Sequence, residues 1–165
     1  MAALARGTRV PQIDLLFPDA SPFRLHDALQ RGALALVFFK VSCPVCQMAL
    51  PWLARMQRDF GGRHAQLIGV SQDDPSATAT FLQRYEVDFP VVLDPAPQYS
   101  ASNGFGLTHV PSVFWIGANG MIEQSVVGFA RADYEALAER MAVANQVQPQ
   151  SLFGESPGIP AFKAG

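Results

Sequence analysis

The chain of 165 residues has only two cysteines, Cys43 and Cys46, and two residues separate them. They follow an apolar run from Ala33 to Phe39 and open a stretch whose apolar residues have helical spacing. A sulfur at a helix N-terminus lies near unpaired backbone N–H groups and the positive end of the helix dipole, and both favour the thiolate. Because the thiolate is the nucleophile in disulfide exchange, the spacing predicts a redox-active pair.

The two sulfurs and their neighbours are expected to have different roles. Cys43 is predicted to be the exposed, attacking sulfur, and Cys46, one turn deeper in the helix, the resolving sulfur. Pro44 has no N–H group and suits a first helical turn, so it and Val45 set the geometry and redox tuning of the pair. Lys40 is a cation that would favour the thiolate, unless its side chain simply extends from the strand end into water.

Two other uses of the cysteines are less consistent with the sequence. A C-x-x-C pair is half of a zinc site, and no second C-x-x-C or H-x-x-H completes it. A purely structural disulfide would be unusual in a chain without an export signal. We therefore expect neither a metal nor a bound cofactor.

Charge and hydropathy exclude several classes of partner. The net charge of −2 provides no basic surface for nucleic acid, and no apolar run approaches the ~18 residues of a membrane helix. Residues 1–10 contain arginines but lack the apolar core of a signal peptide. A cytoplasmic location is expected, although a chain already trimmed of an export signal would look the same.

The elements that must position the cysteines follow from periodicity and turn signals. The run at 33–39 is apolar on both faces, as in a central strand covered on both sides. Asn119-Gly120 between two strand-like runs predicts a hairpin. In chain order we predict short elements within 11–17 and 23–29, strands at 33–39, 66–71, 90–93, 112–116 and 121–127, and helices at 44–60, from 74 onward, and at 131–143.

This order of strands and helices predicts one α/β domain with a mixed sheet over residues 11–144. Residues 1–10 are predicted to be a flexible arm, and residues 145–165 an extended tail. The tail carries three apolar residues that would pin it to the domain or to a second copy of the chain, unless the tail is disordered. These are Phe153, Ile159 and Phe162.

Three features in this order resemble the thioredoxin superfamily. They are C-P-V-C after a buried strand, Pro51 inside the following helix, and Val110-Pro111 directly before a strand. The layout is most similar to the TlpA/ResA-like or AhpC/TSA (redoxin, peroxiredoxin-like) branch. The resemblance implies a thioredoxin-like three-layer sandwich, in which helices cover both faces of a mixed sheet, with an N-terminal extension and a helix inserted within 73–94.

The resemblance also implies a substrate-binding loop. It places Pro111 in the cis form, facing the cysteines across a groove, with the backbone of Val110 free to pair with an extended substrate. An ordinary trans proline at the start of a strand is the alternative. His109 would lie on the rim of this groove and contact substrate, unless it is only a solvent-exposed loop histidine.

The sequence departs from the thioredoxin pattern near the motif. Val37 stands where thioredoxins carry a buried acid, so a proton relay through that position is missing or supplied elsewhere. Ser42 replaces the usual aromatic residue before the first cysteine. Proline directly after Cys43 resembles glutaredoxin and DsbA, and we therefore expect a redox potential above the thioredoxin value of about −270 mV.

Three functions follow as hypotheses. The first is a thiol–disulfide oxidoreductase acting on disulfides of proteins or small thiols, with a thiol or a reductase as electron donor. The second is a peroxiredoxin-like peroxidase, but neither cysteine has the P-x-x-x-T-x-x-C residues of that family before it. The third is a non-catalytic, redox-regulated binding module that uses the same groove.

Overall fold

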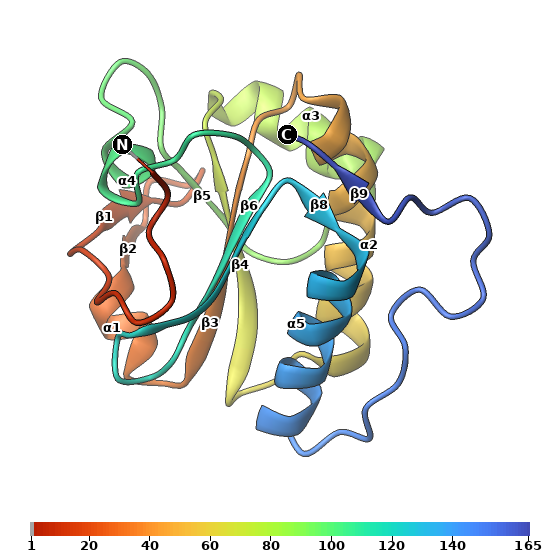
Figure 1. Ribbon diagram of the computed structural model, residues 1–165. Helices are drawn as coiled ribbons and strands as arrows, with labels where there is room; N and C mark the ends of the chain where they lie inside the picture. Colours follow the sequence, from red (N-terminus) through yellow and green to blue (C-terminus); the bar gives the residue numbers. More distant parts are fainter. Residues whose placement is uncertain (1) are drawn as a thin grey trace.

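The computed structural model describes residues 2–165, whose centre is a seven-stranded sheet of order β2-β1-β5-β4-β3-β6-β7 (Figure 1). Strands β3, β4 and β5 run parallel, and the other neighbouring pairs are antiparallel. The predicted mixed sheet is therefore confirmed. The strands are β1 Asp14–Leu16, β2 Pro22–Arg24, β3 Ala33–Phe39, β4 Ala65–Ser71, β5 Val91–Leu93, β6 Ser112–Ile116 and β7 Ile122–Val127.

Helices cover both faces of this sheet, as the resemblance implies. One face of β3 presents Ala35, Val37 and Phe39 to a core shared with α2, α3 and α5, and the other face packs with α1 and α4. Alternating side chains on one strand thus serve two cores, which explains why the run is apolar throughout. The helices are α1 Leu25–Leu29, α2 Pro44–Phe60, α3 Pro75–Arg84, α4 Ser100–Gly104 and α5 Arg131–Ala144.

The N-terminal residues differ from the flexible arm that we predicted. The backbone N–H of Leu4 donates to the carbonyl of Phe105 at 3.0 Å, and that of Gly7 donates to Ile122 at 2.8 Å. Leu4 also packs against the core formed by α1, α4 and the sheet. Backbone pairing beside β7 and apolar contacts of Ala3, Leu4 and Val10 hold the arm, and neither produces periodicity in the sequence.

The C-terminal residues 145–165 have little regular structure, but they are docked on the domain. Leu152 and Phe153 are fully buried, and Ile159 packs against the same core, whereas Phe162 is 60% exposed. Two of the three predicted apolar anchors therefore make the expected contact, and Leu152 is an anchor that we did not predict. The tail also adds β9 (Phe162–Lys163), which pairs antiparallel with β8 (Phe129–Ala130).

No helix within residues 2–165 combines the length and the apolar character that crossing a bilayer requires.

Candidate active site

Cys43 and Cys46 lie where the central strand β3 ends and the helix α2 begins. Cys43 is the N-cap of α2, and its Sγ accepts the backbone N–H of Cys46 at 3.3 Å. This bond uses one of the N–H groups that a helix start leaves unpaired. Both cysteines are free thiols, with Cys43 half-buried and Cys46 fully buried. The structure thus places Cys43 where a substrate can reach it.

The environment of Cys46 favours the neutral thiol. Burial raises the pKa of Cys46 strongly, and the Lys40 backbone opposes part of this effect. The hydrogen bond with Cys43 and the charge of Cys43 raise the pKa further, and the charge of Asp73 makes the smallest contribution in the same direction. Val37, at the position of the thioredoxin acid, is fully buried and belongs to the same apolar core. A proton that leaves this sulfur therefore needs an acceptor other than residue 37.

The loop before β6 faces this cysteine pair. The Val110–Pro111 peptide bond is cis, as predicted. The Cys43 thiol donates to the Val110 carbonyl oxygen at 3.4 Å, so the loop and the attacking sulfur are in direct contact. Pro111 is buried, and the exposed His109 accepts a hydrogen bond at its backbone carbonyl from the Ser112 hydroxyl at 2.8 Å.

The three residues predicted to tune the pair lie around it in different ways. Pro44 is the first residue of α2 and is exposed, and Val45 packs against the core beside the cysteines. The Lys40 side chain is exposed at the end of β3, and among residues 2–165 it forms no ion pair. The structure shows one contribution of Lys40 to the site, a backbone hydrogen bond that lowers the pKa of Cys46.

Two further residues hold the active-site loop, and sequence reasoning missed both. The Asp73 carboxylate accepts the backbone N–H of Val41 at 2.8 Å, and the Gln47 side-chain amide donates to the Val41 carbonyl at 3.0 Å. Asp73 follows β4, which pairs in parallel with β3. Parallel neighbours end at the same sheet edge, and this signal was sufficient to place Asp73 beside the motif.

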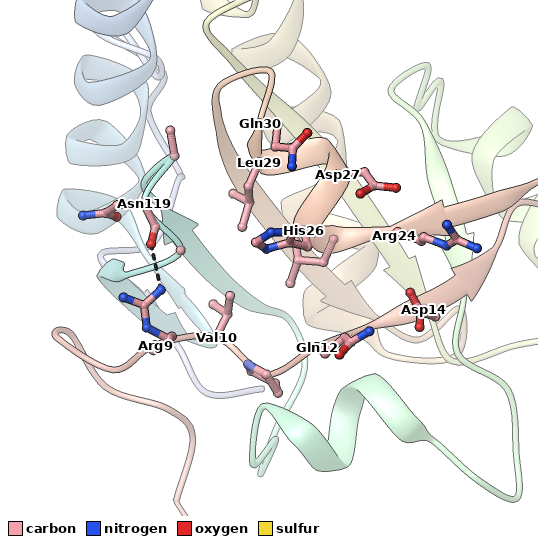
Figure 2. A pocket seen from close by; sticks show the side chains of 14 residues that line it. Arg9, Val10, Gln12, Asp14, Arg24, His26, Asp27, Leu29, Gln30 and Asn119 are labelled. Atoms are coloured by element: carbon pink, nitrogen blue, oxygen red, sulfur yellow. Dashed lines mark hydrogen bonds between the residues drawn. The ribbon is translucent and has the colours of Figure 1, made fainter.

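A pocket of about 660 Å³ (Figure 2) lies at the end of the sheet where β3 begins, and the cysteines follow the other end of β3. Leu25 and Leu29 of α1 line it together with the β6–β7 turn, where Arg9 donates to the carbonyl of Asn119 at 3.0 Å. It includes neither cysteine, and exchange at the surface sulfur of Cys43 does not require an enclosed pocket. Within residues 2–165 no three His, Cys, Asp or Glu side chains cluster as metal ligands.

Residues 7–125 match the AhpC/TSA family. The chain belongs to this family. The match includes Cys43, Cys46 and the cis Pro111, so the whole site described above lies within the family region.

Curated relatives and solved structures agree with this placement. The thiol-disulfide oxidoreductases ResA of Geobacillus thermodenitrificans and Bacillus subtilis are each 24% identical over 127 residues, which is 76% of this chain and 71% and 69% of theirs. A DsbE-like thiol:disulfide interchange protein from Chlorobium tepidum is 27% identical with a TM-score of 0.74, and covers 86% of this chain and 98% of its own. Peroxidoxin BcpB from Mycobacterium tuberculosis, 19% identical with a TM-score of 0.70 over 86% of this chain and 97% of its own, shares the fold.

Together, the thioredoxin-like fold, the cysteine pair at the start of α2 and these relatives identify a thiol–disulfide oxidoreductase of the TlpA/ResA-like branch, as the sequence predicted.

Proposed function

We propose that the protein exchanges disulfides with Cys43 as the nucleophile and Cys46 as the resolving thiol. The observation that carries this assignment is the position of Cys43 Sγ, which is accessible and accepts the Cys46 N–H at the start of α2. A hydrogen bond from that N–H strengthens as the sulfur becomes a thiolate. Cys46 is fully buried and reaches only a partner already attached to Cys43.

The proposed reaction transfers two electrons in two exchanges. The Cys43 thiolate attacks one sulfur of a substrate disulfide, the substrate S–S bond breaks, and the other substrate sulfur leaves as a thiolate. The Cys46 thiolate then attacks Cys43 Sγ in the mixed disulfide and releases the second substrate thiol. The substrate is reduced, the protein holds a Cys43–Cys46 disulfide, and an external dithiol or reductase must return two electrons. The reverse sequence oxidises a substrate dithiol.

The second exchange requires Cys46 to lose a proton that its buried environment retains. The acid of the thioredoxin pattern is absent, since Val37 fills that position. Asp73 is close enough to raise the pKa of Cys46 by its charge, and it is only half-buried. We assign to Asp73 the acceptance of the Cys46 proton, directly or through water.

Substrates of this site are disulfides of proteins or small thiols. The cis Pro111 loop beside Cys43 supports protein substrates, because a backbone edge next to the sulfur can pair with an extended segment. Peroxide is the second candidate, supported by the AhpC/TSA family membership. The threonine that the peroxiredoxin pattern places three residues before its cysteine is Lys40 or Cys43 in the two possible registers.

A paired turnover assay tests this function. The reduced protein is offered insulin with a thiol reductant in one arm and hydrogen peroxide in the other, with Cys43→Ser and Cys46→Ser as variants. We expect insulin reduction by the native protein, no turnover by either variant, and a trapped mixed disulfide in Cys46→Ser. Rapid peroxide consumption that survives in one variant would instead identify a peroxidase and its peroxidatic cysteine. Partner binding that is unchanged in both variants, without turnover, would identify a binding module.

A further inference from the structure

The last residues of the chain form a short strand beside the active-site loop. β9 pairs antiparallel with β8 through Phe129 opposite Lys163 and Ala130 opposite Phe162. The backbone N–H of Arg131 donates to the carbonyl of Ala161 at 2.9 Å. In Figure 1 this dark blue strand lies next to β8, at the end of the sheet where α2 begins. Segment 161–165 therefore adds a strand close to the cysteine pair.

Beyond β9 the chain passes directly over the loop that contains Pro111. A β-carbon added at Gly165 would collide with the carbonyl group of Val110 and would lie 3.2 Å from Cβ of His109. A β-carbon at Gly128 would lie 2.6 Å from the Lys163 carbonyl oxygen, and Gly128 has a φ of +78°, so only glycine fits comfortably there. The backbone of the tail thus lies against the backbone of Val110 and of Gly128 at distances that only glycine permits.

The carbonyl of Val110 is consequently covered from two sides. The Cys43 thiol donates to it at 3.4 Å, and Gly165 packs against the same group. Gly128, against which the segment lies, donates its N–H to the carbonyl of Pro111 at 2.7 Å. The backbone edge that we expected to be free for an extended substrate is therefore already occupied by the protein itself.

We propose that segment 161–165 occupies the backbone edge with which the extended part of a protein substrate would pair. A protein disulfide must therefore displace the segment, whereas a small disulfide need not. This inference rests on the proposed function. A small disulfide needs only the accessible Sγ of Cys43. In a protein substrate, the chain that flanks the reacting cysteine also needs the backbone edge formed by β8 and Val110. The segment therefore determines which class of disulfide is reduced.

The contacts of the tail suit such a displacement. All five residues of segment 161–165 are exposed, so its attachment is mainly through backbone hydrogen bonds. Upstream, Leu152 and Phe153 are buried, and the phenyl ring of Phe153 lies 4.8 Å from the ring of Trp52 and 5.7 Å from that of Phe129. The segment can leave while this anchor keeps it near the site, because little apolar surface holds its end.

Removing residues 161–165 tests the proposal by comparing two substrates. We expect kcat/KM for insulin to rise about fivefold, because the binding-competent fraction increases, and kcat/KM for oxidised glutathione to change less than about twofold. Phe162→Ala is the matched control, since it leaves the backbone pairing intact and its side chain is 60% exposed, and it should behave as the native protein. An unchanged rate with insulin, or an equal rise for both substrates, would overturn the proposal.

A second measurement follows the segment directly. Cys46→Ser is incubated with the disulfide-linked dimer of an extended peptide that contains one cysteine, so that Cys43 attacks the dimer, one peptide leaves as a thiol and the other stays as a mixed disulfide. Amide hydrogen exchange of this complex is compared with that of the free variant. We expect faster exchange at Phe162 and Lys163 in the complex. Protection of these amides that is unchanged by the peptide contradicts displacement. If the proposed function itself is wrong, no mixed disulfide forms and the native protein shows no insulin turnover, so the two failures are distinct.

Discussion

At the scale of single residues, the two sulfurs of the pair have different surroundings. Cys43 is stabilised by an N–H group of its own helix, whereas Cys46 is buried among apolar side chains that include Val37. The nearby carboxylate is Asp73, on the neighbouring strand's end rather than in the central strand. This position leaves the carboxylate half-buried and bonded to the active-site loop, while its charge still acts on Cys46.

Replacing Asp73 with asparagine should lower the pKa of Cys46. Burial is the larger cause of the raised pKa and remains, but the repulsion between a carboxylate and a thiolate is removed. The measurement is thiolate absorbance near 240 nm against pH in a Cys43→Ser background. Asp88→Asn is the matched control, because Asp88 is exposed and pairs with Arg58 at 3.2 Å, away from the cysteines. A pKa that stays the same or rises in the Asp73 variant would show that its charge does not reach Cys46.

The residues of the site differ in how far the sequence could predict them. Cys43, Cys46 and the cis Pro111 belong to a motif with fixed spacing and a known order, and all three were predicted. Asp73 and Gln47 act by contacting the backbone of one loop. The position of Asp73 follows from the parallel pairing of β3 with β4, whereas Gln47 contacts Val41 from the first turn of α2 and belongs to no motif.

At the scale of elements, the start of α2 is the part of the fold that sets the chemistry of the first sulfur. The Cys46 N–H donates to Cys43 Sγ at 3.3 Å, and this bond stabilises the reduced sulfur relative to the disulfide. We therefore predict a redox potential above about −270 mV, that is, a more oxidising couple than thioredoxin. Equilibration with glutathione buffers, followed by the fraction of free thiol, measures it. A midpoint at or below that value would contradict the prediction.

The junction of α5 with the tail makes a second prediction at this scale. The Glu135 carboxylate accepts hydrogen bonds from the Ser151 hydroxyl and from the N–H groups of Leu152 and Phe153, at 2.6, 2.7 and 3.2 Å. Burial by itself would raise the pKa of Glu135, but these hydrogen bonds outweigh it and lower the pKa. A lowered pKa means that the carboxylate stabilises the docked tail above its usual pKa, and that this stabilisation is lost as the pH falls through the lowered value.

Glu135→Gln should therefore lower the free energy of unfolding by about 1 kcal/mol at neutral pH, since charged hydrogen bonds to the tail are lost. Urea unfolding at pH 7 and at acidic pH measures the difference, which should shrink in acid. Glu139→Gln is the control, one turn further along α5 and exposed. Equal stability of the native protein and the Glu135 variant at pH 7 would mean that the carboxylate does not hold the tail.

Periodicity explains which elements the sequence could predict. The strand at 33–39 and the helix at 44–60 were predicted with the bounds that the structure shows, because each is long and strongly patterned. β8 and β9 have two residues each, which is too short for any period. The docking of residues 4–10 depends on backbone hydrogen bonds, and these do not require particular side chains.

At the scale of the whole molecule, the redox state and the stability of the fold are coupled through Cys46. The reduced protein keeps this thiol fully buried in the core between the sheet and α2, and burial strongly raises its pKa. In the unfolded chain the same thiol ionises near its ordinary pKa of about 8.5. Above that pH the unfolded state binds fewer protons than the native state, so the free energy of unfolding must fall as the pH rises.

The oxidised protein provides the control for this effect, because a Cys43–Cys46 disulfide has no thiol to ionise. We predict that the free energy of unfolding of the reduced protein falls by about 1 kcal/mol between about pH 8 and about pH 9.5 relative to the oxidised protein. Urea denaturation of both forms at each pH measures the difference, and Cys46→Ala should remove most of it. Parallel stability curves for the two forms would show that Cys46 is not held neutral in the core, and would also remove the need for Asp73 as a proton acceptor.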